Sequence, residues 1–91
     1  MKRPSPEKAR GMKEELYEGI ASGSLDMPDA SRLMRKILGM NRVEYAQKVL
    51  KLSPRILAEF ENGKGNPTLA TLKKIAAPFG LAVGFVRLPG R

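Results

Sequence analysis

The chain has 91 residues, which is enough for one small hydrophobic core and too few for two domains or an elaborate enzyme cleft. Its 17 Lys and Arg residues against nine Asp and Glu give a net charge of +8, which favours a partner that carries phosphates. Cysteine and histidine are absent, which excludes disulfides, thiolate or imidazole catalysis, and zinc sites built on those ligands.

Other function classes also lack a sequence signal. No apolar run approaches the roughly 20 residues that span a bilayer, and the N-terminus lacks an apolar signal segment, so we expect a cytoplasmic protein without a membrane partner. The acids Glu14, Glu15 and Glu18 lie among lysines on a predicted solvated helix face. Gly63-Lys64-Gly65 alone is a weak match to a phosphate-cradling loop. We therefore expect no enzyme activity, no metal and no cofactor.

Residues 1–25 are predicted to form a basic tail followed by an amphipathic helix. The first ten residues contain four cations and two prolines, a composition that buries little apolar surface. From about Glu7 to Ser22 the apolar side chains recur at spacings of three and four, which predicts a helix that Gly23 ends. These side chains are Ala9, Met12, Leu16 and Ile20.

Residues 26–80 are predicted to hold four further helices, and the first two have clear start signals. Asp26 or Asp29 can cap a helix that Gly39 ends. Its apolar stripe consists of Ala30, Leu33, Met34, Ile37 and Leu38. Asn41 with Glu44 three residues later is a capping box, which predicts a third helix directly afterwards. Its inward side chains are Tyr45, Ala46, Val49 and Leu50.

The last two helices of this region follow serine and threonine caps. Ser53-Pro54 predicts the start of a short helix with Leu57 and Phe60 inside, which ends at Asn62-Gly63. A turn-rich loop over residues 63–67 leads to Thr68, which can cap the fifth helix. The predicted core face of that helix is Leu69, Leu72, Ile75, Ala76 and Phe79. Residues 81–88 are rich in β-formers and bounded by Gly80 and Pro89, so a terminal strand is predicted.

Residues 41–79 resemble the Xre/Cro/CI helix-turn-helix family. The shared pattern is a capped helix, a tight turn, a serine-capped helix, then Glu61-Asn62-Gly63 and Asn66-Pro67-Thr68-Leu69. The resemblance implies a mainly α, lambda-repressor-like helical bundle, here with an extra N-terminal helix and a short C-terminal strand. Two departures stand out. Lys51 occupies the turn position where the family usually has glycine, and Tyr45-Ala46 lies about one residue early, as if the helix carried an extra residue.

In this architecture the second helix of the pair lies in the major groove, with its N-terminal residues toward the base edges. The outward residues are Pro54, Arg55, Ile56, Ala58 and Glu59. Arg55 is expected to bond guanine O6 and N7, with a phosphate contact as the alternative, and Ile56 to pack on a thymine methyl. Glu59 accepts from a cytosine amino group or forms a surface salt bridge.

Phosphate contacts are expected from residues at helix starts and in the loop over residues 63–67. Such contacts position the protein on DNA but do not discriminate between base sequences. These residues are Arg42, Ser53, Lys64 and Asn66. Within the family Glu61 resembles a structural acid that bonds inside the domain. Lys73 and Lys74 are expected on a solvated face.

The predicted terminal strand carries the expectation of a homodimer, because an isolated strand exposes unpaired amides and carbonyls. Residues 81–91 are therefore the predicted dimerisation element, with the strand paired to its copy across a two-fold axis. Its side chains are Leu81, Val83, Phe85, Val86 and Leu88. Such a dimer places two recognition helices roughly 34–36 Å apart and predicts a palindromic operator. A tail packed on its own domain is the alternative.

The resemblance implies a transcriptional repressor that binds double-stranded DNA sequence-specifically. The small basic format with an added N-terminal helix is similar to the antitoxin of a toxin–antitoxin pair, which would add a cognate toxin as a partner. A phage-type or anti-CRISPR-associated autorepressor would use the same residues. A protein-interaction module, similar to coactivators of this fold, is the alternative from another class. The outcome of replacing Arg55 discriminates between reading DNA and binding proteins.

Overall fold

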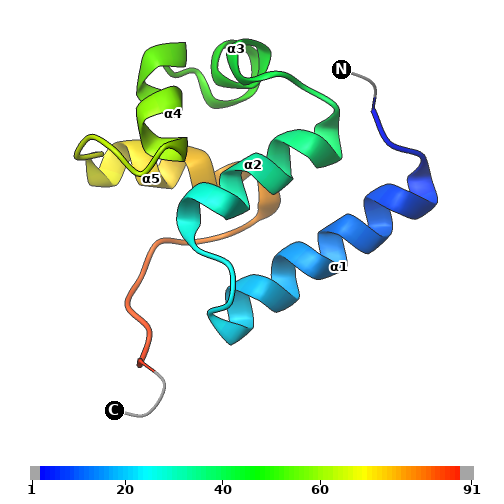
Figure 1. Ribbon diagram of the computed structural model, residues 1–91. Coiled ribbons are helices and arrows are strands. Elements are labelled where there is room, and N and C mark those ends of the chain that lie inside the picture. The colour runs from blue at the N-terminus through cyan, green and yellow to red at the C-terminus, as the bar shows by residue number, and fades with distance from the viewer. Residues whose placement is uncertain (1–2, 89–91) are drawn as a thin grey trace.

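The computed structural model describes residues 3–88, which form five α-helices, one π-helical turn and one 3₁₀ turn (Figure 1). The helices are α1 (Pro6–Ser22), α2 (Met27–Leu38), α3 (Arg42–Glu44), α4 (Pro54–Glu61) and α5 (Leu69–Ala76). A π-helical turn, η1 (Tyr45–Leu50), continues α3, and a 3₁₀ turn, η2 (Ala77–Phe79), continues α5. Met1, Lys2 and Pro89–Arg91 of the predicted terminal regions lie outside the described residues.

The residues that the sequence predicts as helix caps form capping hydrogen bonds in the structure. Asp26, not Asp29, caps α2 by accepting from the Asp29 amide at 2.9 Å. Asn41 and Glu44 form the predicted capping box, with the Glu44 amide 2.9 Å from the Asn41 side chain. Ser53 and Thr68 cap α4 and α5, and Gly23 and Gly39 end α1 and α2 in left-handed conformations. These local signals confirm the predicted order of helices from α1 to α5.

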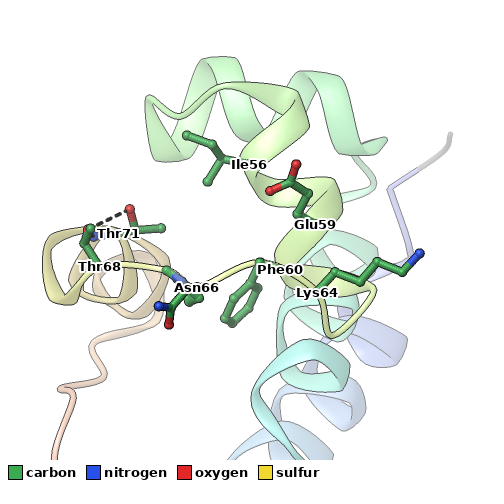
Figure 2. A pocket seen from close by; sticks show the side chains of 9 residues that line it. Ile56, Glu59, Phe60, Lys64, Asn66, Thr68 and Thr71 are labelled. Atoms are coloured by element: carbon green, nitrogen blue, oxygen red, sulfur yellow. Dashed lines mark hydrogen bonds between the residues drawn. The ribbon is translucent and has the colours of Figure 1, made fainter.

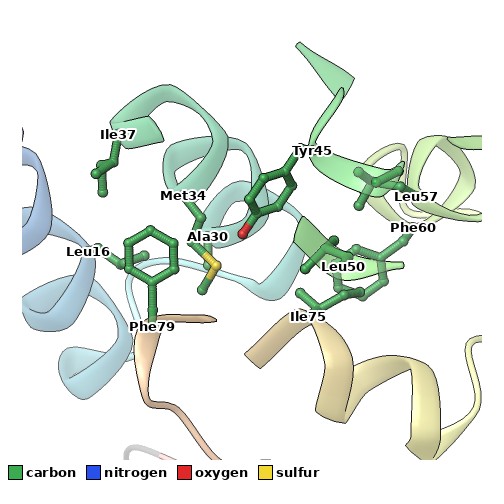
Figure 3. Close-up of a cluster of buried hydrophobic side chains, with 11 residues drawn as sticks. Leu16, Ala30, Met34, Ile37, Tyr45, Leu50, Leu57, Phe60, Ile75 and Phe79 are labelled. Carbon is green, nitrogen blue, oxygen red and sulfur yellow. The ribbon is translucent and has the colours of Figure 1, made fainter. Parts of the chain in front are cut away.

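The core lies between the α1–α2 hairpin and the remaining helices (Figure 3). Leu16 is the fully buried side chain of α1, and it lies in one cluster with Ile37 of α2 and Phe79 of η2. The Tyr17 hydroxyl also donates to the Phe79 carbonyl at 2.9 Å. The N-terminal helix is therefore part of the folded core.

The helix that begins at Asn41 changes from α to π geometry at Tyr45. Its end is marked by hydrogen bonds from the Lys51 amide to the Ala46 carbonyl, five residues back, and from the Leu52 amide to the same oxygen at 2.8 Å. A π-turn holds one residue more than an α-turn. It thus accommodates the extra residue inferred from the early position of Tyr45-Ala46. Lys51, in place of the family's usual glycine, takes a left-handed conformation with φ 57° and ψ 45°.

Two predicted features are wrong. Leu69, assigned to the core face of α5, is 57% exposed, because it is the first residue of the helix and lies beyond the packed part of the stripe. Residues 81–88, predicted as a strand, have no regular secondary structure. A strand needs a neighbour to bond its amides and carbonyls, and residues 3–88 supply no second strand. In the same described part of the chain, no helix has the length and apolar character needed to cross a membrane.

Candidate nucleic-acid interface

The helix α4 separates buried from exposed side chains in the way that the sequence predicts. Leu57 and Phe60 point into the core, whereas Arg55 has a side chain that is 87% exposed. Ile56, next to it, is 42% exposed although it is apolar. Of the other predicted outward residues, Pro54 and Ala58 are half-buried. The first turn of α4 therefore presents a cation and an aliphatic side chain to solvent.

Glu59 lies one helical turn after Arg55 and is paired with it. The Arg55 Nε donates to Glu59 Oε1 at 3.2 Å. Residues four apart on a helix are neighbours on one face, which brings the two side chains together. The surface salt bridge that was one of two expectations for Glu59 is thus present in the structure.

Glu61, at the end of α4, is fully buried and joins three helices. Ser31 Oγ of α2 donates to its carboxylate at 2.8 Å, and Arg35 of α2 donates through Nε and a terminal nitrogen at 2.8–3.2 Å. Arg42 Nε of α3 lies 3.3 Å from the same carboxylate, and Arg32 donates to the Glu61 carbonyl. These hydrogen bonds confirm the expectation that Glu61 is a structural acid bonded inside the domain.

The protonation of Glu61 follows from these partners. Burial alone raises the pKa of a carboxyl group, but the hydrogen bonds from Arg35 and Ser31 and the charge of Arg35 outweigh burial here. The pKa of Glu61 is therefore below its ordinary value, and the group is ionised at neutral pH. The sequence reasoning missed Ser31, Arg32 and Arg35 as its partners. The available signal was that a buried acid needs cations, and α2 carries two arginines three residues apart.

The residues predicted to contact phosphates lie in three places. Lys64 and Asn66 line a pocket of about 150 Å³ between α4 and the start of α5, together with Ile56 and Glu59 (Figure 2). Arg42 lies instead at the start of α3, where its Nε is engaged by Glu61 and its side chain is 38% exposed. The Ser53 hydroxyl oxygen accepts from the Arg55 amide at 3.2 Å as the cap of α4. The outward face of α4 and the loop after it therefore share one surface.

Lys74 has a contact that the sequence did not indicate. It was expected on a solvated face, and it is exposed, but its Nζ donates to the Lys51 carbonyl at 3.3 Å. That carbonyl belongs to the left-handed residue of the turn between η1 and α4. The contact joins positions 23 residues apart, so no local pattern could have predicted it.

Among residues 3–88, no three acidic, His or Cys side chains gather into a group that could hold a metal ion.

Comparison with protein families identifies a helix-turn-helix domain in the chain. A family model described as helix-turn-helix matches residues 32–86, which is more than half of the chain and includes α3, α4 and α5. All of α1 and the first part of α2 lie outside the matched range. Neither the curated proteins nor the solved structures gave a significant match.

Proposed function

This chain belongs to the Xre/Cro/CI-type helix-turn-helix family of DNA-binding transcription regulators, and we propose that it is a repressor that reads a palindromic operator. One observation carries the proposal. The first turn of α4 exposes Arg55 and Ile56 while Leu57 and Phe60 hold the helix on the core. A helix anchored by one face and exposed at its N-terminal end has the geometry that such proteins place in the major groove.

In this proposal the exposed turn of α4 reads base edges. The planar Arg55 guanidinium bonds guanine O6 and N7 together, which discriminates against other bases by about 1–3 kcal/mol. Ile56 packs against a thymine methyl group. Pro54 and Ala58 contribute small apolar surfaces that let the backbone of α4 approach the bases.

Phosphate contacts hold the protein in register on both sides of the reading helix. Arg42 donates to Glu61 through its Nε. We assign its terminal nitrogens to a phosphate beside the start of α3. Ser53, Lys64 and Asn66 contact phosphates near the start of α4 and in the loop after it, where all three are exposed. These contacts give affinity, whereas the Arg55 contact gives sequence preference.

The experiment is selection of an operator from random duplexes, followed by the variant Arg55→Ala. We expect the variant to lose about 10- to 100-fold in affinity for the selected operator and to lose its preference at one G·C pair. Lys13→Ala on α1 removes the same charge far from α4 and keeps the preference. If no duplex sequence is enriched, or if Arg55→Ala keeps the same preference, the protein-interaction alternative replaces this proposal.

The proposed repressor is a homodimer joined through residues 81–88. Every residue from 82 to 88 is exposed, and the segment includes the large apolar side chains of Val83, Phe85, Val86 and Leu88. Leu81, half-buried, anchors its start by donating its amide to the Ala76 carbonyl at 3.1 Å. Exposed apolar side chains along residues 82–88, whose amides have no backbone partner within the described part of the chain, support a contact with a second copy across a two-fold axis.

A biological role as the antitoxin of a toxin–antitoxin pair is the finer part of the proposal. Its support is the format: a small DNA-binding domain with a helix, α1, outside the range of the family match. Co-expression with the product of the neighbouring reading frame tests the role. A stable complex that relieves growth inhibition supports an antitoxin, whereas a neighbour without toxicity and without binding supports an autorepressor.

A further inference from the structure

The salt bridge between Arg55 and Glu59 contributes little to the folding stability of the protein. The Arg55 side chain is 87% exposed and that of Glu59 is 45% exposed, and exposed pairs of this spacing add little to folding stability. The hydrogen bond uses Nε of the guanidinium. The two terminal nitrogens, which can form a bidentate contact with guanine, are left for another partner.

Glu59 is the less exposed member of this pair and lies beside the loop after α4. Its backbone carbonyl accepts from the Lys64 amide at 2.8 Å, which ties α4 to the following loop. Its second carboxylate oxygen, Oε2, lies against Gly65, where an added Cβ would be only 3.2 Å away. Gly65 also has φ +79°, so glycine is favoured at this position for two reasons. The backbone of Glu59 is therefore tied to the loop, and its carboxylate lies beside Gly65 while the Arg55 side chain extends from it into solvent.

The charge of Glu59 is unusual for this surface. A carboxylate beside DNA is repelled by the phosphates, and the other charged side chain that lines this pocket, Lys64, is a cation. Paired with Arg55, Glu59 cancels one positive charge at the reading helix. An unpaired Arg55 would instead be drawn to whichever phosphate is nearest, because phosphates are the strongest anions in reach.

We propose that Glu59 is a positioning residue that holds the Arg55 guanidinium for a base edge and keeps it from the phosphates. This inference rests on the proposed operator binding and refines it, because it removes Glu59 from the base-reading residues. Glu59 then lowers affinity for unrelated DNA and raises the preference for guanine at the Arg55 position.

Two variants separate positioning from charge. Glu59→Ala removes both the acceptor and the charge, whereas Glu59→Gln keeps an acceptor oxygen for Arg55 Nε and removes only the charge. Glu18→Gln on α1 makes the same charge change away from α4 and serves as the control. Binding is measured on the selected operator, on operators with each base substituted at the Arg55 position, and on an unrelated duplex over a range of salt concentrations.

We expect Glu59→Ala to lose roughly fivefold or more of the guanine preference, which is part of the discrimination that a bidentate contact supplies. Glu59→Gln keeps most of that preference. Both variants bind the unrelated duplex more tightly, because each removes a carboxylate that the phosphates repel. Only Glu59→Ala also steepens the salt slope by about one, as the released Arg55 gains a phosphate. In an Arg55→Ala background, Glu59→Ala changes the base preference no further.

Three results overturn the inference. Unchanged guanine preference and unchanged non-specific affinity in Glu59→Ala show that the pair is only a surface salt bridge. If Glu59→Ala loses a preference for cytosine both in the wild type and in the Arg55→Ala background, Glu59 contacts a base itself. If the wild-type chain shows no sequence preference at all, the proposed function fails together with this inference. If the wild type shows a preference that Glu59→Ala leaves unchanged, only this inference fails.

Discussion

Glu61 shows at the scale of a single residue how this fold holds together. Its carboxylate is the common acceptor for α2 and α3 at the end of α4, and it is fully buried. A buried charge is tolerated when its hydrogen-bonding capacity is filled, as it is here. Removal of the charge leaves Arg35, whose side chain is only 12% exposed, without its partner.

We expect Glu61→Gln to lower the free energy of unfolding by about 3 kcal/mol at neutral pH, because breaking one side of a buried ion pair strands the other. The pH dependence follows from the lowered pKa of Glu61. The wild type keeps this stability above the unfolded-state pKa of about 4.3 and loses it as the pH falls through the lower folded-state pKa. Urea unfolding from pH 7 to pH 3 measures both effects. A Gln variant with the same acid dependence as wild type contradicts the assignment.

Tyr45 gives a second prediction at this scale. Its side chain is buried in the core cluster of Figure 3, and its hydroxyl has no hydrogen-bond partner among residues 3–88. Burial, with the nearby charge of Glu61, raises the pKa of Tyr45 to about 12. The folded state therefore loses stability as the pH rises from the unfolded-state pKa of about 10 to about 12.

We expect Tyr45→Phe to be neutral or to stabilise the protein by about 1 kcal/mol, since it removes a buried polar group without a partner. The variant also lacks this alkaline loss of stability. Thermal unfolding at pH 7 and pH 11 provides the comparison, with Tyr17→Phe as the control. The Tyr17 hydroxyl does have a partner, the Phe79 carbonyl, so its removal should destabilise. Destabilisation of Tyr45→Phe at pH 7 by more than 1 kcal/mol would falsify the expectation.

At the scale of elements, η1 shows how one added residue is absorbed. Tyr45 and Leu50 are both buried although they lie five positions apart, and a π-turn returns to the same face after about that interval. In an α-helix the same return takes four residues. The exposed Gln47 lies between them and contributes no buried surface.

Deletion of Gln47 should therefore convert η1 to an α-turn and keep Tyr45 and Leu50 in the core. We expect the free energy of unfolding to change by less than about 1 kcal/mol, because regular α hydrogen bonds replace the π ones. Denaturant unfolding measures the change, and the α hydrogen bonds can be verified by NMR. Deletion of Ala46, which is fully buried, is the contrasting variant and should unfold the domain. Equal damage from both deletions would show that the π-turn is required.

The elements also show what the sequence could predict. The capping residues Asp26, Asn41, Ser53 and Thr68 act within three residues of themselves, so their motifs were sufficient. The partners of Glu61 lie 19 to 30 residues away, and only the assembled fold brings them together. The strand prediction failed because β-propensity describes one segment, whereas a strand also needs a neighbour. Likewise, an apolar stripe could not indicate that the end of α5 carrying Leu69 has nothing to pack against.

At the scale of the whole molecule, charge is unevenly distributed along the chain. Residues 14–29 contain five acids and no cation, and they form the end of α1 and the start of α2. After residue 29 the acids are Glu44, Glu59 and Glu61, and each is in an ion pair. Residues 30–91 hold 12 of the 17 Lys and Arg residues, so most of the excess of cations belongs to the part of the fold that carries the proposed reading surface. Such an uneven charge distribution orients a protein toward DNA as the two approach, and the association rate then depends strongly on salt concentration.

The proposed dimer gives the prediction that belongs to this scale. Removal of residues 82–91 leaves every described core residue in place, because the core ends with Phe79 and the half-buried Leu81. The truncated chain should therefore fold with nearly unchanged stability but sediment as a monomer where the full chain is a dimer. Its affinity for an operator with two half-sites should fall on the order of 100-fold, since the two contacts are no longer linked.

An operator with one half-site is the internal control, because both chains should bind it about equally well. The full chain should also lose affinity when the half-site spacing departs from a whole helical turn, whereas the truncated chain should tolerate any spacing. A truncated chain that still sediments as a dimer with the same spacing preference would move the interface away from residues 81–88. A full chain that sediments as a monomer would instead support the alternative that this segment is a tail packed on its own domain.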